Sequence, residues 1–509
     1  MNPDLRTIRV ATLMERSGVA FGTSGARGLV SAMTDEVCYV YTRAFLQHLQ
    51  AAGEIAADSR RVAVAGDLRP SSGRIMRAVA RAALDGGFAP AHCGRIPSPA
   101  VALYGIEQRC PSIMVTGSHI PDDRNGIKFN RPDGEISKTD EAGIRAQTVT
   151  LPADLIDDAG AFRDQVSAWL PEARGDAHAA YVRRYLDFFP PSALTGLRVG
   201  LYEHSCVARD ALAAVLSALG AEVVPLGRSE VFVPVDTEAI RPEDIALARG
   251  WAAEGHFDAL VSADGDGDRP LLADERGVWL RGDVAGILCA RYLGADAVVT
   301  PVSSNTAVER CGWFRKVLRT RIGSPYVIDG MARAVAEGAR AVVGYEANGG
   351  FLTASELAVG GRRLTPLPTR DAVLVVVAIL TLARRRTATV SRLLEDLPAR
   401  HTASDRLKDF PTELSRAHLA GFDTGDAERD RREVEAVFGR HFGRVSGLDR
   451  TDGLRITFAN GDVAHLRPSG NAPELRCYNE AASEAQALEM NRTCLAILDT
   501  WRETTEQGC

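Results

Sequence analysis

The sequence lacks the cysteine patterns that cross-link small domains or bind zinc. Its nine cysteines are scattered along 509 residues, their number is odd, and no two are spaced as C-x-x-C. A disulfide framework and a zinc site are therefore not expected, and reduced thiols in a cytoplasm fit this pattern better.

Long apolar runs are also missing. The longest, near Ala372–Ala383, is shorter than the roughly 20 residues that cross a bilayer, and it predicts a buried helix. The N-terminal stretch MNPDLRTIRVATLMERSG carries charges throughout and has no apolar centre of a signal peptide. We expect a soluble, cytoplasmic protein without a membrane partner.

An excess of positive charge is absent as well. The formal net charge of -6 argues against a general nucleic-acid binder. It does not argue against a small anionic substrate, because the local charge at a site decides such binding. A chain of this length is too long to fold around a single hydrophobic core, and about three or four domains are expected.

Strand-like and helix-like segments alternate over the first three-quarters of the chain. The segment RVAVAGDLRP predicts a strand and a loop, and an amphipathic helix follows and stops at Gly86 and Gly87. Repeats of this pattern predict α/β domains with largely parallel sheets. In the last hundred residues, a charge-rich segment over 405–439 predicts helix, and a hairpin is expected to turn at Asn460-Gly461. The expected domains are 1–155, 156–290 and 291–400, all α/β, and a smaller α+β domain over 401–509.

Three aspartates alternate with glycines in the segment DGDGDR. Asp264, Asp266 and Asp268 gather three carboxylates, and Gly265 and Gly267 let the segment curl around one divalent cation. Without a cation these like charges would repel one another. A metal site is therefore predicted, with a solvated acidic turn as the alternative.

Three further loops offer groups for a phosphorylated ligand. In RPSGNAPELRCY, two arginines flank a tight turn. One bound anion could therefore accept hydrogen bonds from guanidinium groups, a hydroxyl, an amide and backbone N–H groups. These residues are Arg467, Ser469, Gly470, Asn471 and Arg476. In GYEANGGFL, Glu346 and Asn348 follow an apolar strand and could bind polyol hydroxyls, and FGTSGARG carries Arg27 among small residues. Each segment is also compatible with an ordinary turn.

The segment VTGSHIPDDRNGIKF places Ser118 beside His119, with Lys128 further along the same loop. Neighbouring Ser and His residues seldom form a catalytic couple, and no G-x-S-x-G elbow surrounds Ser118, so a serine hydrolase is disfavoured. Together with a cation site and arginine-rich loops, Ser118 indicates phosphoryl chemistry. His119 could contact phosphate or only satisfy the loop backbone.

In this order the loops resemble those of the α-D-phosphohexomutase superfamily, from Phe21 to about Asn479. TGSHIP is similar to its phosphoserine loop T-A/G-S-H-N-P, and DGDGDR to its magnesium loop. GYEANGG is similar to its sugar-binding motif G-E-x-S-G-H, RPSGNAPELRCY to its phosphate-binding motif R-P-S-G-T-E-P, and FGTSGARG to its N-terminal motif F-G-T-x-G-x-R-G. The resemblance implies three related α/β domains and a smaller fourth around one central cleft.

The resemblance also implies a role for each site residue. Ser118 would carry the phosphate, and the three aspartates would hold Mg²⁺ together with an oxygen of that phosphate. Lys128 would act as general acid and base, with Arg27 beside the reacting phosphoryl group. His119 is expected among the catalytic residues, and Arg269, in the metal loop, is expected among the substrate-binding residues. The residues implied for substrate are Glu346 and Asn348 for sugar hydroxyls, and Arg467, Ser469, Gly470, Asn471 and Arg476 for the non-reacting phosphate.

The sugar and phosphate loops depart from the pattern of the superfamily. Ile120 replaces Asn in the serine loop, Asn348 replaces Ser, Gly350 replaces His, and Asn471-Ala472 replaces Thr-Glu. The serine and the three aspartates are intact. The chemistry is therefore better supported by the resemblance than the identity of the sugar.

We expect a phosphomannomutase-type isomerase that interconverts hexose 6-phosphate and hexose 1-phosphate. The route would pass through a phosphoserine enzyme and a hexose 1,6-bisphosphate intermediate. Phosphoglucomutase and phosphoglucosamine mutase activity are alternatives within the class. A non-catalytic sugar-phosphate sensor and a metal-dependent phosphatase are alternatives from other classes. The expected partner is a small sugar phosphate rather than nucleic acid or membrane, and the chain is expected to be a monomer or dimer.

Overall fold

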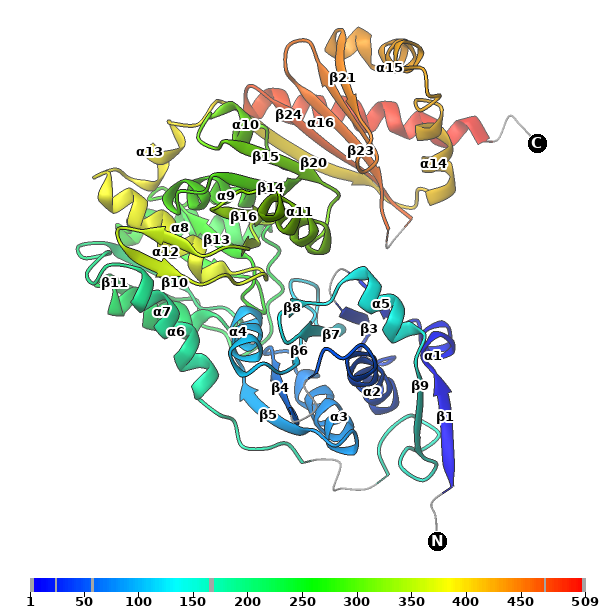
Figure 1. Cartoon of the computed structure of the whole chain (residues 1–509). Helices are drawn as coiled ribbons and strands as arrows, with labels where there is room; N and C mark the ends of the chain where they lie inside the picture. The colour runs from blue at the N-terminus through cyan, green and yellow to red at the C-terminus, as the bar shows by residue number, and fades with distance from the viewer. Residues whose placement is uncertain (1–3, 23–24, 56–58, 164–168, 471–472, 506–509) are drawn as a thin grey trace. The chain divides into compact units, whose positions relative to one another are not determined.

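The chain forms two compact units in the computed structural model, which describes residues 4–22, 25–55, 59–163, 169–470 and 473–505 (Figure 1). The first unit comprises Met1–Val298 and Met331–Leu393, and the second comprises Val299–Gly330 and Leu394–Cys509. Each unit has a hydrophobic core of its own.

The first unit begins with a mixed sheet in the order β2-β3-β7-β6-β4-β5, with β8 paired to β7. Strand β4 is parallel to β5 and β6, and the other pairs are antiparallel. The strands are β2 (Ala20–Phe21), β3 (Gly25–Leu29), β4 (Arg61–Gly66), β5 (Ala89–Gly94), β6 (Ser112–Val115), β7 (Arg124–Arg131) and β8 (Gly134–Glu135). The predicted strand that precedes the GDLRP loop is therefore confirmed as β4.

Helices cover both faces of this sheet. Alternate residues of β4 point to opposite faces, so Val62 and Val64 pack with α2 (Asp35–Ala51) and α3 (Ser72–Asp85) in one core. Helix α4 (Ser98–Gln108) packs on the other face, as Figure 1 shows. The remaining elements here are β1 (Leu5–Arg9), which pairs with β9 (Thr148–Pro152), and the helices α1 (Val10–Ser17) and α5 (Lys138–Arg145). The carboxyl ends of β4 and β6 thus lie at one edge, where loops carry function in many α/β folds.

Helix α6 (Asp176–Phe188) leads into a second sheet with the order β11-β10-β12-β13. Its strands are β10 (Arg198–Tyr202), β11 (Glu222–Leu226), β12 (Ala259–Ala263) and β13 (Pro270–Ala273), and its helices are α7 (Arg209–Ala218) and α8 (Pro242–Gly255). Strands β10, β11 and β12 are parallel, whereas β12 and β13 form an antiparallel pair that ends at Ala263 and Pro270. The DGDGDR segment is therefore the turn of a buried hairpin.

The rest of the first unit carries the GYEANGG segment between β16 (Val342–Tyr345) and β17 (Phe351–Thr353), which pair antiparallel. Helix α12 (Ala372–Arg385) is buried along most of its length, which confirms the helix predicted from the longest apolar run. Neighbouring elements are α9 (Gly282–Tyr292), β18 (Leu357–Val359) and β19 (Arg362–Leu364). Three elements cross the boundary between the units: β14 (Ala297–Pro301), α11 (Ser324–Ala336) and α13 (Val390–Leu394).

The second unit contains an antiparallel sheet in the order β20-β24-β23-β22-β21. The strands are β20 (His401–Leu407), β21 (Val445–Asp449), β22 (Leu454–Phe458), β23 (Val463–Pro468) and β24 (Leu475–Ala481). The other elements are α14 (Thr412–Ala420), α15 (Ala427–Phe442), α16 (Glu484–Asp499), η2 (Thr500–Thr505), α10 (Ala307–Arg310) and β15 (Lys316–Thr320). The hairpin predicted at Asn460-Gly461 is confirmed between β22 and β23, with Gly461 at φ 86°.

The prediction of helix from residue 405 onward is wrong at its start. Residues 405–407 belong to β20, an edge strand that pairs with β24, because cross-strand pairing overrides the weak local preference of a charged segment. The predicted class, α/β with a smaller α+β part at the C-terminal end, is confirmed. Among the described residues, no helix is both long enough and apolar enough to span a bilayer.

Candidate active site

Ser118 lies at the carboxyl end of β6 in a strained and buried position. Its backbone φ is 57°, in the left-handed region that side chains other than glycine seldom adopt. The side chain is buried, and the backbone N–H donates to Thr116 Oγ1 at 2.7 Å. Such strain costs on the order of 1–3 kcal/mol and persists only where surrounding contacts hold it.

An arginine that was not predicted from the sequence fixes the serine loop by hydrogen bonds to its backbone. Arg69, in the loop after β4, donates from Nη2 to the carbonyls of Ser118 (3.0 Å) and Ile120. Its Nη1 donates to Asp67, which also accepts from the Thr116 hydroxyl at 2.7 Å and the Ser72 hydroxyl at 2.5 Å. The guanidinium also lies 4.1 Å from the centre of the Phe232 ring. The signal in the sequence was the polar GDLRP segment directly after a buried strand, a usual place for functional loops.

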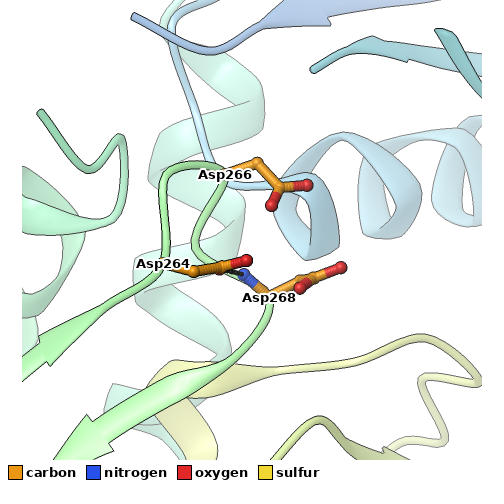
Figure 2. Close-up of side chains that lie close together, drawn as sticks. All are labelled: Asp264, Asp266 and Asp268. Atoms are coloured by element: carbon orange, nitrogen blue, oxygen red, sulfur yellow. Dashed lines mark hydrogen bonds between the residues drawn. The ribbon is translucent and has the colours of Figure 1, made fainter. Parts of the chain in front are cut away.

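The three predicted metal ligands come together at the turn between β12 and β13. One oxygen of each carboxylate in Asp264, Asp266 and Asp268 lies within 4.8 Å of the others, and all three side chains are buried. Figure 2 shows the side chains extending to the same side of the loop. Gly267 adopts φ 70°, and a Cβ on Gly265 would lie 2.8 Å from the Ser118 carbonyl oxygen. The glycines therefore allow both the turn and the close approach of the serine loop.

The charges in this cluster favour a cation. Burial and the neighbouring carboxylates of Asp266 and Asp268 raise the pKa of Asp264 well above its usual value. Burial acts in the same direction on Asp268, but Arg370 and Lys128 outweigh it and hold its pKa low. Within the described part of the chain, Oδ1 of Asp266 and Oδ1 of Asp268 have no hydrogen-bond partner. Buried carboxylate oxygens without donors are suited to a hard divalent cation, so the residues fit a metal site.

The serine and the aspartate cluster meet directly. Ser118 Oγ donates to Asp264 Oδ2 at 2.7 Å, and Lys128 Nζ donates to Asp266 Oδ2 and Asp268 Oδ2 at 2.6 Å each. Burial alone would lower the pKa of Lys128, but these carboxylates outweigh it and raise the pKa. Lys128 is therefore an ammonium at neutral pH, and it lies against the groups predicted to bind metal.

Arg27 shares a face of the sheet with Lys128. In the register of β3 and β7, Lys128 lies opposite Gly25 and Arg27 lies opposite Gly126, which places the two cations diagonally on one face. Burial and the neighbouring Arg269 lower the pKa of Arg27 to about 10, so it stays charged at neutral pH. The predicted pair of cations beside the serine loop is thus brought together by the sheet.

His119 is a neutral neighbour of Ser118. Its Nδ1 lies 3.4 Å from Ser118 Oγ and accepts from Arg269 Nη1 at 2.9 Å, and its Nε2 lies 3.9 Å from Asp236. Burial and the positive charge of Arg269 lower the pKa of His119 to about 3. Since Nδ1 is an acceptor, the ring proton is on Nε2, facing Asp236.

The predicted sugar-binding residues lie in the same unit. Glu346 and Asn348 follow β16 and are buried, and Asn348 Oδ1 accepts from the Gly350 N–H at 2.9 Å. Arg370 donates to Glu346 Oε2 at 3.2 Å and to Asp268 Oδ2 at 3.0 Å. Arg370 was not predicted, and it connects the sugar loop with the aspartate cluster.

The predicted phosphate loop lies in the second unit, where it joins β23 to β24. Arg467 and Arg476 are directly opposite in the strand register, although like charges in that position repel. Arg467 Nε donates to Asp452 at 2.8 Å, and Arg476 lies 3.6 Å from Glu474. The remaining predicted residues are Ser469, Gly470 and Asn471. Of these three, Asn471 lies outside the described residues. Paired arginines beside a tight turn are suited to an anion.

Comparison with known proteins covers almost the whole chain. Four phosphoglucomutase/phosphomannomutase families match in order: alpha/beta/alpha domain I over residues 18–152, domain II over 177–277, domain III over 281–401, and the C-terminal domain over 422–493. A phosphomannomutase of Sinorhizobium fredii is 45% identical over 95% of this chain and 99% of its own length. One from Salmonella muenchen is 44% identical over 95% and 96%.

A solved structure has the same fold. The phosphoglucomutase/phosphomannomutase family protein of Burkholderia thailandensis superposes with a TM-score of 0.68 at 20% identity, and the match covers 94% of this chain and 97% of that one. At 20% identity, the structural similarity supports only the fold. The evidence that this chain is related to the family comes from the sequence matches.

Proposed function

Since the chain belongs to the phosphoglucomutase/phosphomannomutase family, we propose that it is a phosphomannomutase that works through a phosphoserine at Ser118. It interconverts hexose 6-phosphate and hexose 1-phosphate through a hexose 1,6-bisphosphate. The observation that carries this proposal is the contact between the Ser118 hydroxyl and Asp264 in a buried cluster of three carboxylates. Relatives of this chain that are named phosphomannomutases support the choice of mannose.

The reaction transfers one phosphoryl group in each direction. The bond between phosphorus and Ser118 Oγ breaks as a bond to the free hydroxyl of the hexose phosphate forms, which gives the bisphosphate. The bisphosphate then presents its other phosphate, and Ser118 Oγ takes it back. Because the serine is buried and held in place by Thr116 and Arg69, water has little access to the phosphoserine.

Lys128 supplies the proton balance. As an ammonium it donates a proton to Ser118 Oγ when that oxygen leaves phosphorus, and as the resulting amine it accepts the proton of the attacking sugar hydroxyl. Arg27 and Arg269 add positive charge around the phosphoryl oxygens, and neutral His119 offers an uncharged ring beside Ser118. The second half of the cycle uses the same groups in reverse.

Asp264, Asp266 and Asp268 are proposed to hold Mg²⁺, since two of their buried oxygens have no donor within the described chain. When bound, such a cation would supply positive charge that offsets the negative charge of the phosphoryl oxygens. Glu346 and Asn348 are proposed to bind sugar hydroxyls. The residues proposed for the non-reacting phosphate are Arg467, Ser469, Gly470, Asn471 and Arg476. The four segments 1–155, 156–290, 291–400 and 401–509 are proposed as domains, which carry the serine loop, the metal loop, the sugar-binding loop and the phosphate-binding loop respectively.

The proposal is tested by assaying isomer formation from the 1-phosphate and 6-phosphate of mannose, glucose and glucosamine. We expect the highest kcat/KM with mannose phosphates and a phosphate-sized mass adduct on the purified protein that is absent in Ser118→Ala. The matched control is Ser446→Ala, an exposed serine of the second unit. Release of inorganic phosphate without isomer formation would indicate a phosphatase. Binding without turnover would indicate a sensor, and a preference for another sugar would reassign the substrate.

A further inference from the structure

Arg370 is a buried arginine at the entrance to helix α12 that belongs to none of the predicted motifs. Its side chain is 4% exposed, and its Nε and Nη1 reach Asp268 Oδ2 and Glu346 Oε2 at 3.0 and 3.2 Å. Glu135 lies 4.0 Å from Nη2. One guanidinium thus faces a carboxylate of the metal cluster and a carboxylate of the sugar loop. Burying a cation in this way is stable only because carboxylates surround it.

The backbone on both sides of Arg370 is fixed by buried polar contacts. The preceding Thr369 donates from Oγ1 to Glu135 Oε1 at 2.8 Å. The following Asp371 caps α12 by accepting from the Leu374 N–H, and it also accepts from the hydroxyls of Tyr181 at 2.9 Å and Tyr185 at 2.7 Å. An arginine on such a rigid base loses little side-chain freedom when it orients a partner.

Gly350 makes the path of the Arg370 side chain possible. A Cβ built on Gly350 would lie 2.4 Å from Arg370 Cδ and 2.6 Å from Cγ, distances at which atoms overlap. These atoms are in the middle of the side chain, so the arginine could not avoid the clash by moving its tip. Position 350 is also where the superfamily motif G-E-x-S-G-H has its histidine. The chain therefore has an arginine side chain passing over the site where a histidine side chain would begin.

We propose that Arg370 is a positioning residue that orients Glu346 toward the sugar, and that Gly350 is present in order to admit it. This inference rests on the proposed function, because Glu346 is assigned to the sugar through that function. Arg370 takes over the space of the missing histidine from a different segment of the chain. Its anchor is Asp268, so the sugar loop and the metal loop are held at a fixed separation by one side chain.

The first test separates substrate positioning from general support of the fold. We expect Arg370→Met to raise KM for hexose phosphate by at least about 10-fold, the effect of losing one charge-assisted hydrogen bond. Arg370→Lys, which keeps the charge but not the fork, should lie between Arg370→Met and the unmodified protein. The dissociation constant of the hexose phosphate, measured by calorimetry in a Ser118→Ala background, should rise in parallel. The control is Arg363→Met, an exposed arginine of β19 paired with Glu356.

A purely structural role predicts a different result. Arg370→Met would then lower the melting temperature and the fraction of active protein, with KM and the dissociation constant unchanged. Arg370→Lys would give no intermediate value. Either outcome overturns the assignment of Arg370 as a positioning residue for Glu346.

The second test is a double-mutant cycle between positions 350 and 370. Gly350→Ala should raise KM about as much as Arg370→Ala, since the added methyl group displaces the arginine. In an Arg370→Ala background, Gly350→Ala should add less than a twofold change, because its clash partner is gone. Additive effects would show that the glycine serves something other than Arg370 and would overturn that half of the proposal.

Failure of this inference can be told apart from failure of the proposed function. If the unmodified protein interconverts sugar phosphates and Arg370→Met has the same KM, the mutase assignment stands and the positioning role is wrong. If the unmodified protein forms no isomer with any of the three sugars, the function is wrong. The calorimetric dissociation constants still test the position of Arg370 in that case, because they need no turnover.

Discussion

The hydroxyl of Ser118 lies 2.7 Å from Oδ2 of Asp264, although 146 positions separate the two residues in the chain. The contact joins the loop after β6 to the turn after β12, two segments from different sheets of the first unit. A phosphoryl group on that hydroxyl would be adjacent to the three carboxylates, and its added negative charge would strengthen the attraction of this cluster for a divalent cation. The proposed magnesium site and the proposed phosphoserine are therefore expected to be in direct contact.

Replacing a single aspartate should abolish the stabilisation of the protein by divalent cations. Binding at 100 times the dissociation constant stabilises a folded protein by about 2.7 kcal/mol, so Mg²⁺ or Mn²⁺ should raise the melting temperature of the unmodified protein. In Asp264→Asn this rise should disappear, and Mn²⁺ binding followed by electron paramagnetic resonance should be lost. Asp258→Asn, at an exposed aspartate of the same unit, is the control. A normal metal-induced rise in Asp264→Asn contradicts the assignment of the site.

The strain of the left-handed backbone at Ser118 should appear as a difference in stability between two variants. Ser118→Gly and Ser118→Ala both remove the hydroxyl, but glycine adopts φ 57° without strain. Ser118→Gly should therefore be more stable than Ser118→Ala by about 1 kcal/mol, after allowance for the greater entropy of glycine in the unfolded chain. Both variants should lack isomerase activity. Thermal melting of the two proteins under the same conditions decides the matter, and a more stable alanine variant would mean that the conformation is unstrained.

Two substitutions can separate the contribution of the positive charge of Lys128 from that of its proton transfer. Lys128→Met leaves Asp266 and Asp268 without their shared ammonium, so in the absence of divalent cations it should melt at a lower temperature than the unmodified protein. Lys128→Arg keeps a charge that does not release a proton at neutral pH. Lys128→Arg should therefore melt at a higher temperature than Lys128→Met. Both variants should have a kcat lower than that of the unmodified protein by about 100-fold or more. A kcat for Lys128→Arg near that of the unmodified protein would exclude proton transfer by Lys128.

The buried His204 should make the protein less stable as the pH falls. Its Nε2 donates to the Ala263 carbonyl at 2.8 Å, Nδ1 has no hydrogen-bond partner within the described chain, and burial lowers its pKa from 6.5 to about 4. Between these values the unfolded chain binds a proton that the folded chain does not. The free energy of unfolding should therefore fall by about 3 kcal/mol from this group as the pH drops through that range.

Urea unfolding of the unmodified protein and of His204→Gln, compared across the same pH range, measures this contribution. Glutamine can still donate to the carbonyl but does not titrate, so the variant should lose stability less steeply on acidification. Equal slopes for the two proteins would show that His204 is not the titrating group.

The sequence predicted the motif-bearing loops better than the residues that support them. The three aspartates are recognisable because they lie within five consecutive residues, and Ser118 because of its turn-rich surroundings. Arg69 lies in the polar segment after a strand and Arg370 directly before a helix, but these positions do not show what the side chains contact, since their partners Ser118 and Asp268 lie 49 and 102 positions away. A lone arginine after a strand or before a helix has many possible roles, and only the fold decides among them. The strand at residues 405–407 was missed for the same reason, because its partner β24 is distant in the chain.

The close approach of Arg370 to the bare backbone of Gly350 restricts how this lineage can have evolved. A side chain at position 350 and an arginine on its present path at position 370 would overlap, so a lineage that changes one of these positions is expected to change the other as well. Among its natural relatives, a histidine or alanine at the first position should therefore occur only with a short residue at the second. A survey of relatives would detect this as exclusion between two sites that are 20 positions apart in the printed sequence.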